Sequence, residues 1–370
     1  MVILFVLLVI AAGFCCTSCE NHARLVTYSI FDVPLDSVTG EVWYPELLAD
    51  AFGMVNFSSK LCFIGPDKQH LVYLVDEKTG KEWGYAGIVG QGPEDMQARP
   101  QYVGKSAKGD TIRLYDYNER KLNTYWVTQT ADGLPKLKQV EKKSLLDTKV
   151  GKMTNSYMNL CRLDNGFYVG MGYFSESDQF LTLLDKDLNV IKQFGEQPLS
   201  GLRSDGKIKN YSGFQGHISV RGNNIFYAAD QFSYMARYDI SNTGEVIQTW
   251  GHQYAYVDYE VYKEWTISFK RCEDNLYGFS DIAIGEKYIF ATYSGIPIGE
   301  MFKHNSYAIA AQTLVVINKE DGAVLGRFKL SSRSAFLCLS DDEEHLYVMN
   351  IDPELQVERI EVDDLLDKID

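Results

Sequence analysis

The chain has 370 residues, with 50 acidic against 36 basic side chains and a net charge of -14. Charged residues make up 23% and hydrophobic residues 45%, a globular balance that argues against wholesale disorder and against a polytopic membrane protein. The surplus of acid repels phosphate backbones, so we expect no nucleic-acid partner. Aromatic residues reach 13%, which favours β structure because such side chains fit half-buried pleated surfaces.

The start of the chain is predicted to be an export signal. Residues 2–12 are all apolar, too few to span a bilayer with margin, and polar residues follow directly after Cys19. The sequence Cys16-Thr17-Ser18-Cys19 resembles a bacterial lipobox. The resemblance implies a lipoprotein signal peptide over residues 1–18, acylation of Cys19 and a short tether over residues 19–23. Membrane lipid is then an expected partner, at the outer membrane or the cell surface. An ordinary signal peptide is the alternative.

Four cysteines remain beyond the leader: Cys62, Cys161, Cys272 and Cys338. They form no CxxC pair, and three of them stand in apolar runs typical of strands. We therefore expect small buried hydrophobic residues rather than disulfides or a metal site, and no cofactor.

The body of the chain repeats one unit, in which an apolar strand ends in Asp or Asn and a turn with Gly or Asn follows. The last of these strand ends lies 274 residues after the first, so five steps average about 55 residues, although single steps run from 32 to 79. Such spacing is typical of propeller blades. The sequence predicts an all-β, six-bladed β-propeller of four-stranded antiparallel blades over residues 24–370. The six strand ends are Asp76, Asp116, Asp185, Asp239, Asn318 and Asn350.

A ring of blades must also be closed. After Asn350 only one further strand is evident, at residues 356–362, while residues 24–31 form a strand without a partner at the beginning. We expect residues 24–31 to pair into the last blade as its outer strand.

Two other stretches are distinctive. Aromatic residues recur between 254 and 269, partly at helical spacing, which predicts a short amphipathic helix packed on the propeller; an exposed aromatic platform for a sugar or peptide is the alternative. The acidic run at residues 341–344 is predicted to be a solvated hairpin tip rather than a calcium site, because calcium loops space their oxygens at alternate positions.

No catalytic motif of the GxSxG, HExxH or P-loop kind occurs in the sequence. Ligands of propellers meet the central channel, so polar residues on the strands that open each unit are the candidates for binding. His217 and Asp281 could form a proton-transfer or metal-binding pair there. The favoured alternative is that both satisfy backbone groups in a wet channel. The candidates are Gln101, Asn159, Gln215, His217 and Asp281.

A family resemblance rests on residues 277–282, 288–295 and 90–96. The first two segments look like the penultimate region of the TolB-like six-bladed β-propeller lipoproteins of Gram-negative gut anaerobes. The third, Gly-Gln-Gly-Pro-Glu-Asp-Met, is similar to a Gly-x-Gly-Pro-Gly-Glu-Phe turn of that family, with Glu94 in place of the third Gly. The resemblance implies an envelope lipoprotein and transfers no catalytic residue.

Two functions follow as expectations. The first is a non-catalytic, envelope-anchored binding or scaffold module for a protein, peptide or glycan partner. The second is a secreted propeller hydrolase or lyase that acts on a carbohydrate or lactone through channel carboxylates and His217. Because the repeat accounts for nearly all distinctive residues, the first is favoured.

Overall fold

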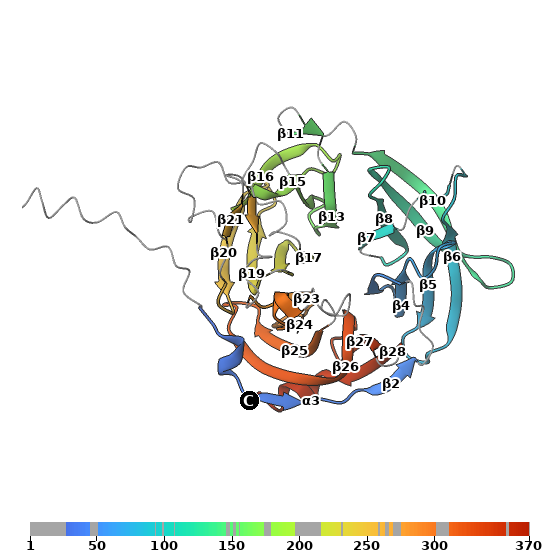
Figure 1. Ribbon diagram of the computed structural model, residues 1–370. Helices are drawn as coiled ribbons and strands as arrows, with labels where there is room; N and C mark the ends of the chain where they lie inside the picture. The colour runs from blue at the N-terminus through green and yellow to red at the C-terminus, as the bar shows by residue number, and fades with distance from the viewer. Residues whose placement is uncertain are drawn as a thin grey trace, which may run out of the picture.

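The structure of the protein is a computed structural model. It describes residues 27–44, 51–145 except 93, 98, 99 and 107, 149–150, 153–154, 156–173, 179–196, 216–230, 232–257, 260–262, 266–268, 275–300, 311–352 and 355–369. Antiparallel sheets stand side by side around a common axis as the blades of a propeller (Figure 1). The predicted all-β propeller with four-stranded antiparallel blades is therefore confirmed.

Within the described ranges, four sheets are separate and have four strands each, ordered as in the sequence. Their first strands lie nearest the axis (Figure 1). The sheets are β3 (Met54–Asn56), β4 (Lys60–Ile64), β5 (His70–Asp76) and β6 (Glu82–Ile88); β7 (Pro100–Lys105), β8 (Thr111–Asp116), β9 (Lys121–Gln129) and β10 (Pro135–Ser144); β13 (Ser156–Arg162), β14 (Tyr168–Tyr173), β15 (Gln179–Leu184) and β16 (Val190–Glu196); and β17 (Gly216–Arg221), β18 (Asn224–Ala229), β19 (Tyr234–Ile240) and β20 (Val246–Gln253).

The remaining large sheet has eight strands and joins the two ends of the chain. Its central strand, β26, is long enough to pair with two strands. Residues 324–329, and Ser334 beyond a bulge, pair with β25, and residues 333–339 pair with β27. The strands are β23 (Phe279–Ile284), β24 (Tyr288–Tyr293), β25 (Ala311–Asn318), β26 (Val324–Leu339), β27 (His345–Asp352), β28 (Gln356–Glu361) and β2 (Glu41–Tyr44), with β1 (Leu35–Ser37) parallel to β26.

The prediction that residues 24–31 form the outer strand of the last blade is wrong. Residues 24–26 lie outside the described residues, and the 3-10 helix η1 (Ile30–Asp32) follows. The Ser29 hydroxyl accepts a hydrogen bond from the Phe31 N–H at 3.2 Å, and Pro34 has no N–H to give a ladder, so the chain turns here instead of extending. Strand β2 pairs with β28 in its place.

Residues 27–44, which we call the strap, run along the outside of the ring (Figure 1). The Thr27 and Ile30 N–H groups donate to the carbonyls of Gln253 and Tyr254, at the end of β20, at 3.0 and 3.3 Å. Strand β1 then joins β26, and β2 joins β28. One segment thus holds the fourth separate sheet and both halves of the eight-stranded sheet.

The turns use the predicted strand-end acids. The Asp76 carboxylate accepts from the Thr79 N–H at 3.0 Å, and the Asp116 carboxylate accepts from the Glu119 N–H at 2.9 Å. Gly80 has φ +65°, a left-handed conformation that suits glycine. The six strand ends do not hold one place in the unit: Asp116 and Asn350 end or lie in second strands, and the other four lie in or directly after third strands.

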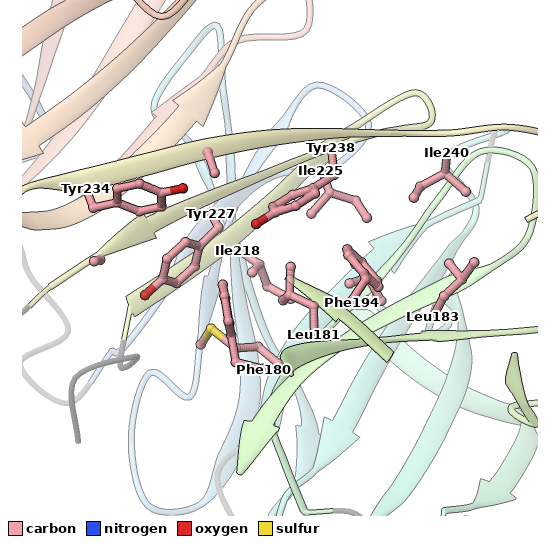
Figure 2. Close-up of a cluster of buried hydrophobic side chains, with 14 of the residues drawn as sticks. Phe180, Leu181, Leu183, Phe194, Ile218, Ile225, Tyr227, Tyr234, Tyr238 and Ile240 are labelled. Carbon is pink, nitrogen blue, oxygen red and sulfur yellow. The ribbon is translucent and has the colours of Figure 1, made fainter. Parts of the chain in front are cut away.

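The core lies between neighbouring blades. Figure 2 shows side chains of the β13–β16 sheet packed face to face against those of the β17–β20 sheet. The rings of Phe180 and Tyr227 lie 4.5 Å apart, and those of Phe194 and Tyr238 lie 5.3 Å apart. Each sheet therefore buries its faces on its neighbours, which explains the high aromatic content.

The predicted amphipathic helix is also wrong. Strands β21 (Glu260–Tyr262) and β22 (Thr266–Ser268) pair as an antiparallel hairpin, because β-branched Val261, Thr266 and Ile267 suit strands better than the aromatic spacing suits a helix. Their side chains lie outside the described residues, so the aromatic platform stays a prediction.

A second small hairpin is formed by β11 (Lys149–Val150) and β12 (Met153–Thr154), and α3 (Val362–Leu366) ends the described fold.

Cys62 and Cys338 are buried, Cys161 is half-buried, and all three are unpaired thiols. Burial raises the pKa of the Cys161 thiol to about 12, so it stays protonated. Cys272 lies outside the described residues.

Across the parts of the chain that the structure describes, no helix is long and apolar enough to cross a membrane.

Candidate functional site: the central channel

The first strands of the blades surround a cavity of about 640 Å³ on the propeller axis. Its lining comes from β3, β7, β13, β17 and β23 and from residues 336–339 of β26. Four of the predicted candidates, Gln101, Asn159, His217 and Asp281, line this cavity. Gln215 lies outside the described residues.

Polar side chains link the first strands to one another. The Gln101 amide on β7 donates to the Asn159 side chain on β13, and its oxygen accepts from the Leu160 N–H at 3.2 Å. The Asn159 amide in turn donates to the Gly216 carbonyl on β17 at 3.1 Å. These bonds run around the channel wall from blade to blade, so the two amides position neighbouring first strands.

Asp281 continues this pattern on β23. Its carboxylate accepts from the Leu337 N–H of β26 at 2.8 Å and from the Ile282 N–H at 2.9 Å. Burial in the channel wall raises the pKa of this carboxyl to about 7, and the two backbone bonds offset only part of that effect. Asp281 therefore accepts hydrogen bonds from backbone groups, which is the role that the sequence analysis favoured for it.

His217 lies on β17 and is half-buried at the cavity wall. Desolvation lowers the pKa of its imidazole to about 4, so the ring is neutral at pH 7. Among the described residues, no hydrogen bond or ion pair joins His217 to Asp281. Their action as a pair stays a prediction.

One rim of the channel carries three cations that the sequence analysis missed. Lys105, Arg162 and Arg221 are the last residues of β7, β13 and β17, and all three line the cavity. Their spacing of 57 and 59 residues matches one blade, so a search for charge at the repeat period would have found them.

The acidic turn after β26 reaches two of these cations. Asp341 binds the Lys105 ammonium at 2.7 Å, and Glu343 forms an ion pair with Arg221. The run predicted as a solvated tip is therefore partly engaged at the channel rim. Asp342, Glu344 and His345 each place one ligand atom within 4.8 Å of the others, a grouping that exposed acidic turns often have without an ion.

The comparisons with known proteins give likenesses in fold. No protein-family model and no curated protein matches the sequence. Among solved structures, a protein from Bacteroides fragilis described as an exported protein is similar over 88% of this chain and 99% of its own, with 11% identity and a TM-score of 0.55. The β-propeller domain of Cps50 (Swd1) from Myceliophthora thermophila matches 84% of this chain and 82% of its own, at 9% identity and a TM-score of 0.49. A gluconolactonase from Xanthomonas campestris matches 86% of this chain and 88% of its own, at 10% identity and a TM-score of 0.47.

The chain has a propeller fold. At these identities the likeness concerns the fold alone, so the function has to be argued from the channel.

Proposed function

We propose that this chain is an exported, envelope-anchored lipoprotein whose propeller is a non-catalytic binding or scaffold module, with the central channel as its ligand site. The observation that carries the proposal is the 640 Å³ cavity, whose wall combines amides, a carboxyl, an imidazole and cations from successive blades. A concave site with a few convergent polar groups is what ligand binding requires. The bound partner would be a protein segment, a peptide or a glycan.

The proposal includes six blades and membership of the TolB-like propeller lipoproteins. The four separate sheets count as four blades, and the eight-stranded sheet divides at β26 into two. Residues 324–329 of β26 complete one with β23, β24 and β25, and residues 333–339 begin another with β27, β28 and β2. Each of the six units then holds one of the six strand-end residues, which supports the count.

Filling the channel is expected to abolish partner binding. Ser219 on β17 lines the cavity, so Ser219→Trp would occupy it, whereas Ser219→Ala leaves it open. Cross-linking of the intact protein in its envelope, read by mass spectrometry, should give an adduct for wild type and Ser219→Ala but not for Ser219→Trp. A control substitution, Ile247→Trp on an outer strand where Ile247 is 58% exposed, should leave the adduct unchanged.

The same experiment tests the anchor. The Cys19→Ser variant should lose the acyl modification of the mature N-terminus and move to the soluble fraction. Equal adducts with Ser219→Trp and Ser219→Ala would contradict the channel site, and an acylated envelope protein in the Cys19→Ser strain would contradict the anchor. Turnover of a glycan or lactone by the purified domain, lost in His217→Ala, would favour the hydrolase or lyase alternative.

A further inference from the structure

The three rim cations, Lys105, Arg162 and Arg221, differ in their ion-pair and hydrogen-bond partners. Lys105 is paired with Asp341, and Arg221 contacts Glu343, Glu286 at 3.5 Å and the Ile284 carbonyl at 3.0 Å. Arg162 stands between these two blades and lines the same cavity, and its guanidinium group has no hydrogen bond or ion pair to any residue that the structure describes. Asp164 also lines the cavity but forms no ion pair with it.

A second guanidinium group belongs to a neighbour of Arg162. Arg113 on β8 is the register partner of Gly104 on β7, and a Cβ atom placed on Gly104 would lie 3.4 Å from the Arg162 Cβ atom. Arg113 on β8 has its pKa lowered, first by burial and then by the charge of Arg162, and the opposing effects of Tyr168 and Glu141 are smaller. Its Nη1 atom is buried without a hydrogen-bond partner. The repulsion between the two neighbouring cations costs stability, and the unbonded Nη1 atom of Arg113 adds to that cost.

We propose that Arg162, supported by Arg113, binds the carboxylate of a monoanionic ligand seated in the channel. A guanidinium group presents paired donors that match a carboxylate, and a negative charge at this point would relieve the repulsion between the two arginines. The ligand is a monoanion because Asp341, Glu343 and Asp164 lie at or near the same rim and repel a second charge. This inference rests on the proposed channel function and names the ligand class.

The test uses D-glucuronate as the probe, with neutral D-glucose and inorganic phosphate beside it, in isothermal titrations of the soluble domain. Wild type should bind glucuronate more tightly than glucose or phosphate, and affinity should fall as salt rises. Arg162→Gln should weaken glucuronate binding about tenfold or more, as expected for loss of a charged hydrogen-bonded pair. Arg333→Gln, at a half-buried arginine of β26 that lies outside the cavity lining, should leave glucuronate affinity unchanged.

Thermal unfolding separates a binding role from a structural one. If Arg162 is kept for binding, the unfolding temperature of Arg162→Gln should be equal to or above that of wild type, because repulsion with Arg113 is removed. Unchanged glucuronate affinity in Arg162→Gln, no glucuronate binding by wild type, or a clear loss of thermal stability in the variant would each overturn the inference. If the channel-filling Ser219→Trp still blocks partner cross-linking in that case, only the ligand class is wrong and the channel function stands.

Discussion

A chain that begins at residue 46 is expected not to fold. This truncation removes the strap, and with it Ile30, Val38 and Tyr44, which are 0, 7 and 7% exposed. Burial of one large apolar side chain contributes about 1.5–3 kcal/mol, so three such side chains represent roughly 5–9 kcal/mol. A typical domain has only about 5–15 kcal/mol of net stability. Near-ultraviolet circular dichroism should therefore show no cooperative unfolding transition.

The loss goes beyond the buried side chains. Without β2 the outer edge of β28 has no partner, and without residues 27–30 the end of β20 loses its link to the strap. A chain that begins at residue 27 is the matched control, because it keeps the strap, and it should show a cooperative unfolding transition. A cooperative transition at an unchanged midpoint in the chain from residue 46 would show that the strap is dispensable.

The second large effect is expected at Asp281. Asp281→Ala removes the acceptor for two N–H groups in the channel wall, of which that of Leu337 belongs to a residue only 3% exposed. An unsatisfied buried donor costs about 1–3 kcal/mol, so with two such donors this variant should lose about 2–6 kcal/mol of unfolding free energy. Asp281→Asn keeps one acceptor oxygen and should lose less. Guanidinium unfolding of the three proteins checks this order, and an Asp281→Ala variant as stable as wild type would contradict it.

The same carboxyl gives the stability a defined pH dependence. Its pKa is raised from 3.8 to about 7 on folding, so between these values the folded state holds more protons at this site than the unfolded state. Its contribution to stability therefore falls as pH rises from about 4 to about 7 and is constant above. The difference in unfolding free energy between Asp281→Asn and wild type should therefore shift by about 1–4 kcal/mol in favour of the variant as pH rises through that window. If the unfolding free energies of wild type and Asp281→Asn changed with pH in parallel, that result would contradict the raised pKa of Asp281.

His217 acts in the opposite direction over much of this range. Its pKa falls from 6.5 to about 4 on folding, so its contribution to stability rises with pH between these values. The contributions of Asp281 and His217 to the pH dependence of stability largely cancel in wild type. The effect of Asp281 is therefore seen in the comparison with Asp281→Asn and not in the wild-type protein alone.

The repeat was readable from sequence because its turns are chemically local. The carboxylates of Asp76 and Asp116 bind backbone N–H groups three residues later, a signal that needs no tertiary structure. The irregular spacing had a cause that the sequence did not reveal. Asp116 and Asn350 belong to second strands, whereas the other four residues lie in or directly after third strands. The step that leads to a second-strand residue is therefore shorter by about one strand, and the step after Asp116 is longer. The longest step, from Asp239 to Asn318, has another cause, because it contains the hairpin of β21 and β22 between two blades.

Closure of the ring was harder to predict because it depends on partners more than 300 residues apart. An apolar pattern at residues 24–31 suggested a strand, but such a pattern also fits a segment that turns at Ser29 and in which, of the described residues 27–31, only Ile30 is buried. The exposed pattern of β2, with two of its four residues exposed, gave little sign of a strand that closes the last sheet.

The channel was predicted in part for a similar reason. Polar residues on first strands stand out against apolar neighbours, and this located Gln101, Asn159, His217 and Asp281 on the cavity wall. Charged residues at strand ends look like ordinary surface residues. In the sequence, Lys105, Arg162 and Arg221 are marked only by their blade-length spacing, and the ring brings these three positions to one rim of the channel.

The central claim, that β2 closes the ring on β28, is tested most directly by a disulfide between Glu41→Cys and Arg359→Cys. These residues are register partners and form an ion pair, so their Cβ atoms are suited to cross-linking. In a Cys272→Ser domain beginning at residue 27, we predict complete oxidation, a faster-migrating band and a higher unfolding midpoint. The mispaired control, Glu41→Cys with Arg333→Cys, should stay reduced. Failure of the two introduced thiols on β2 and β28 to bond, or equal oxidation of the control, would contradict the account.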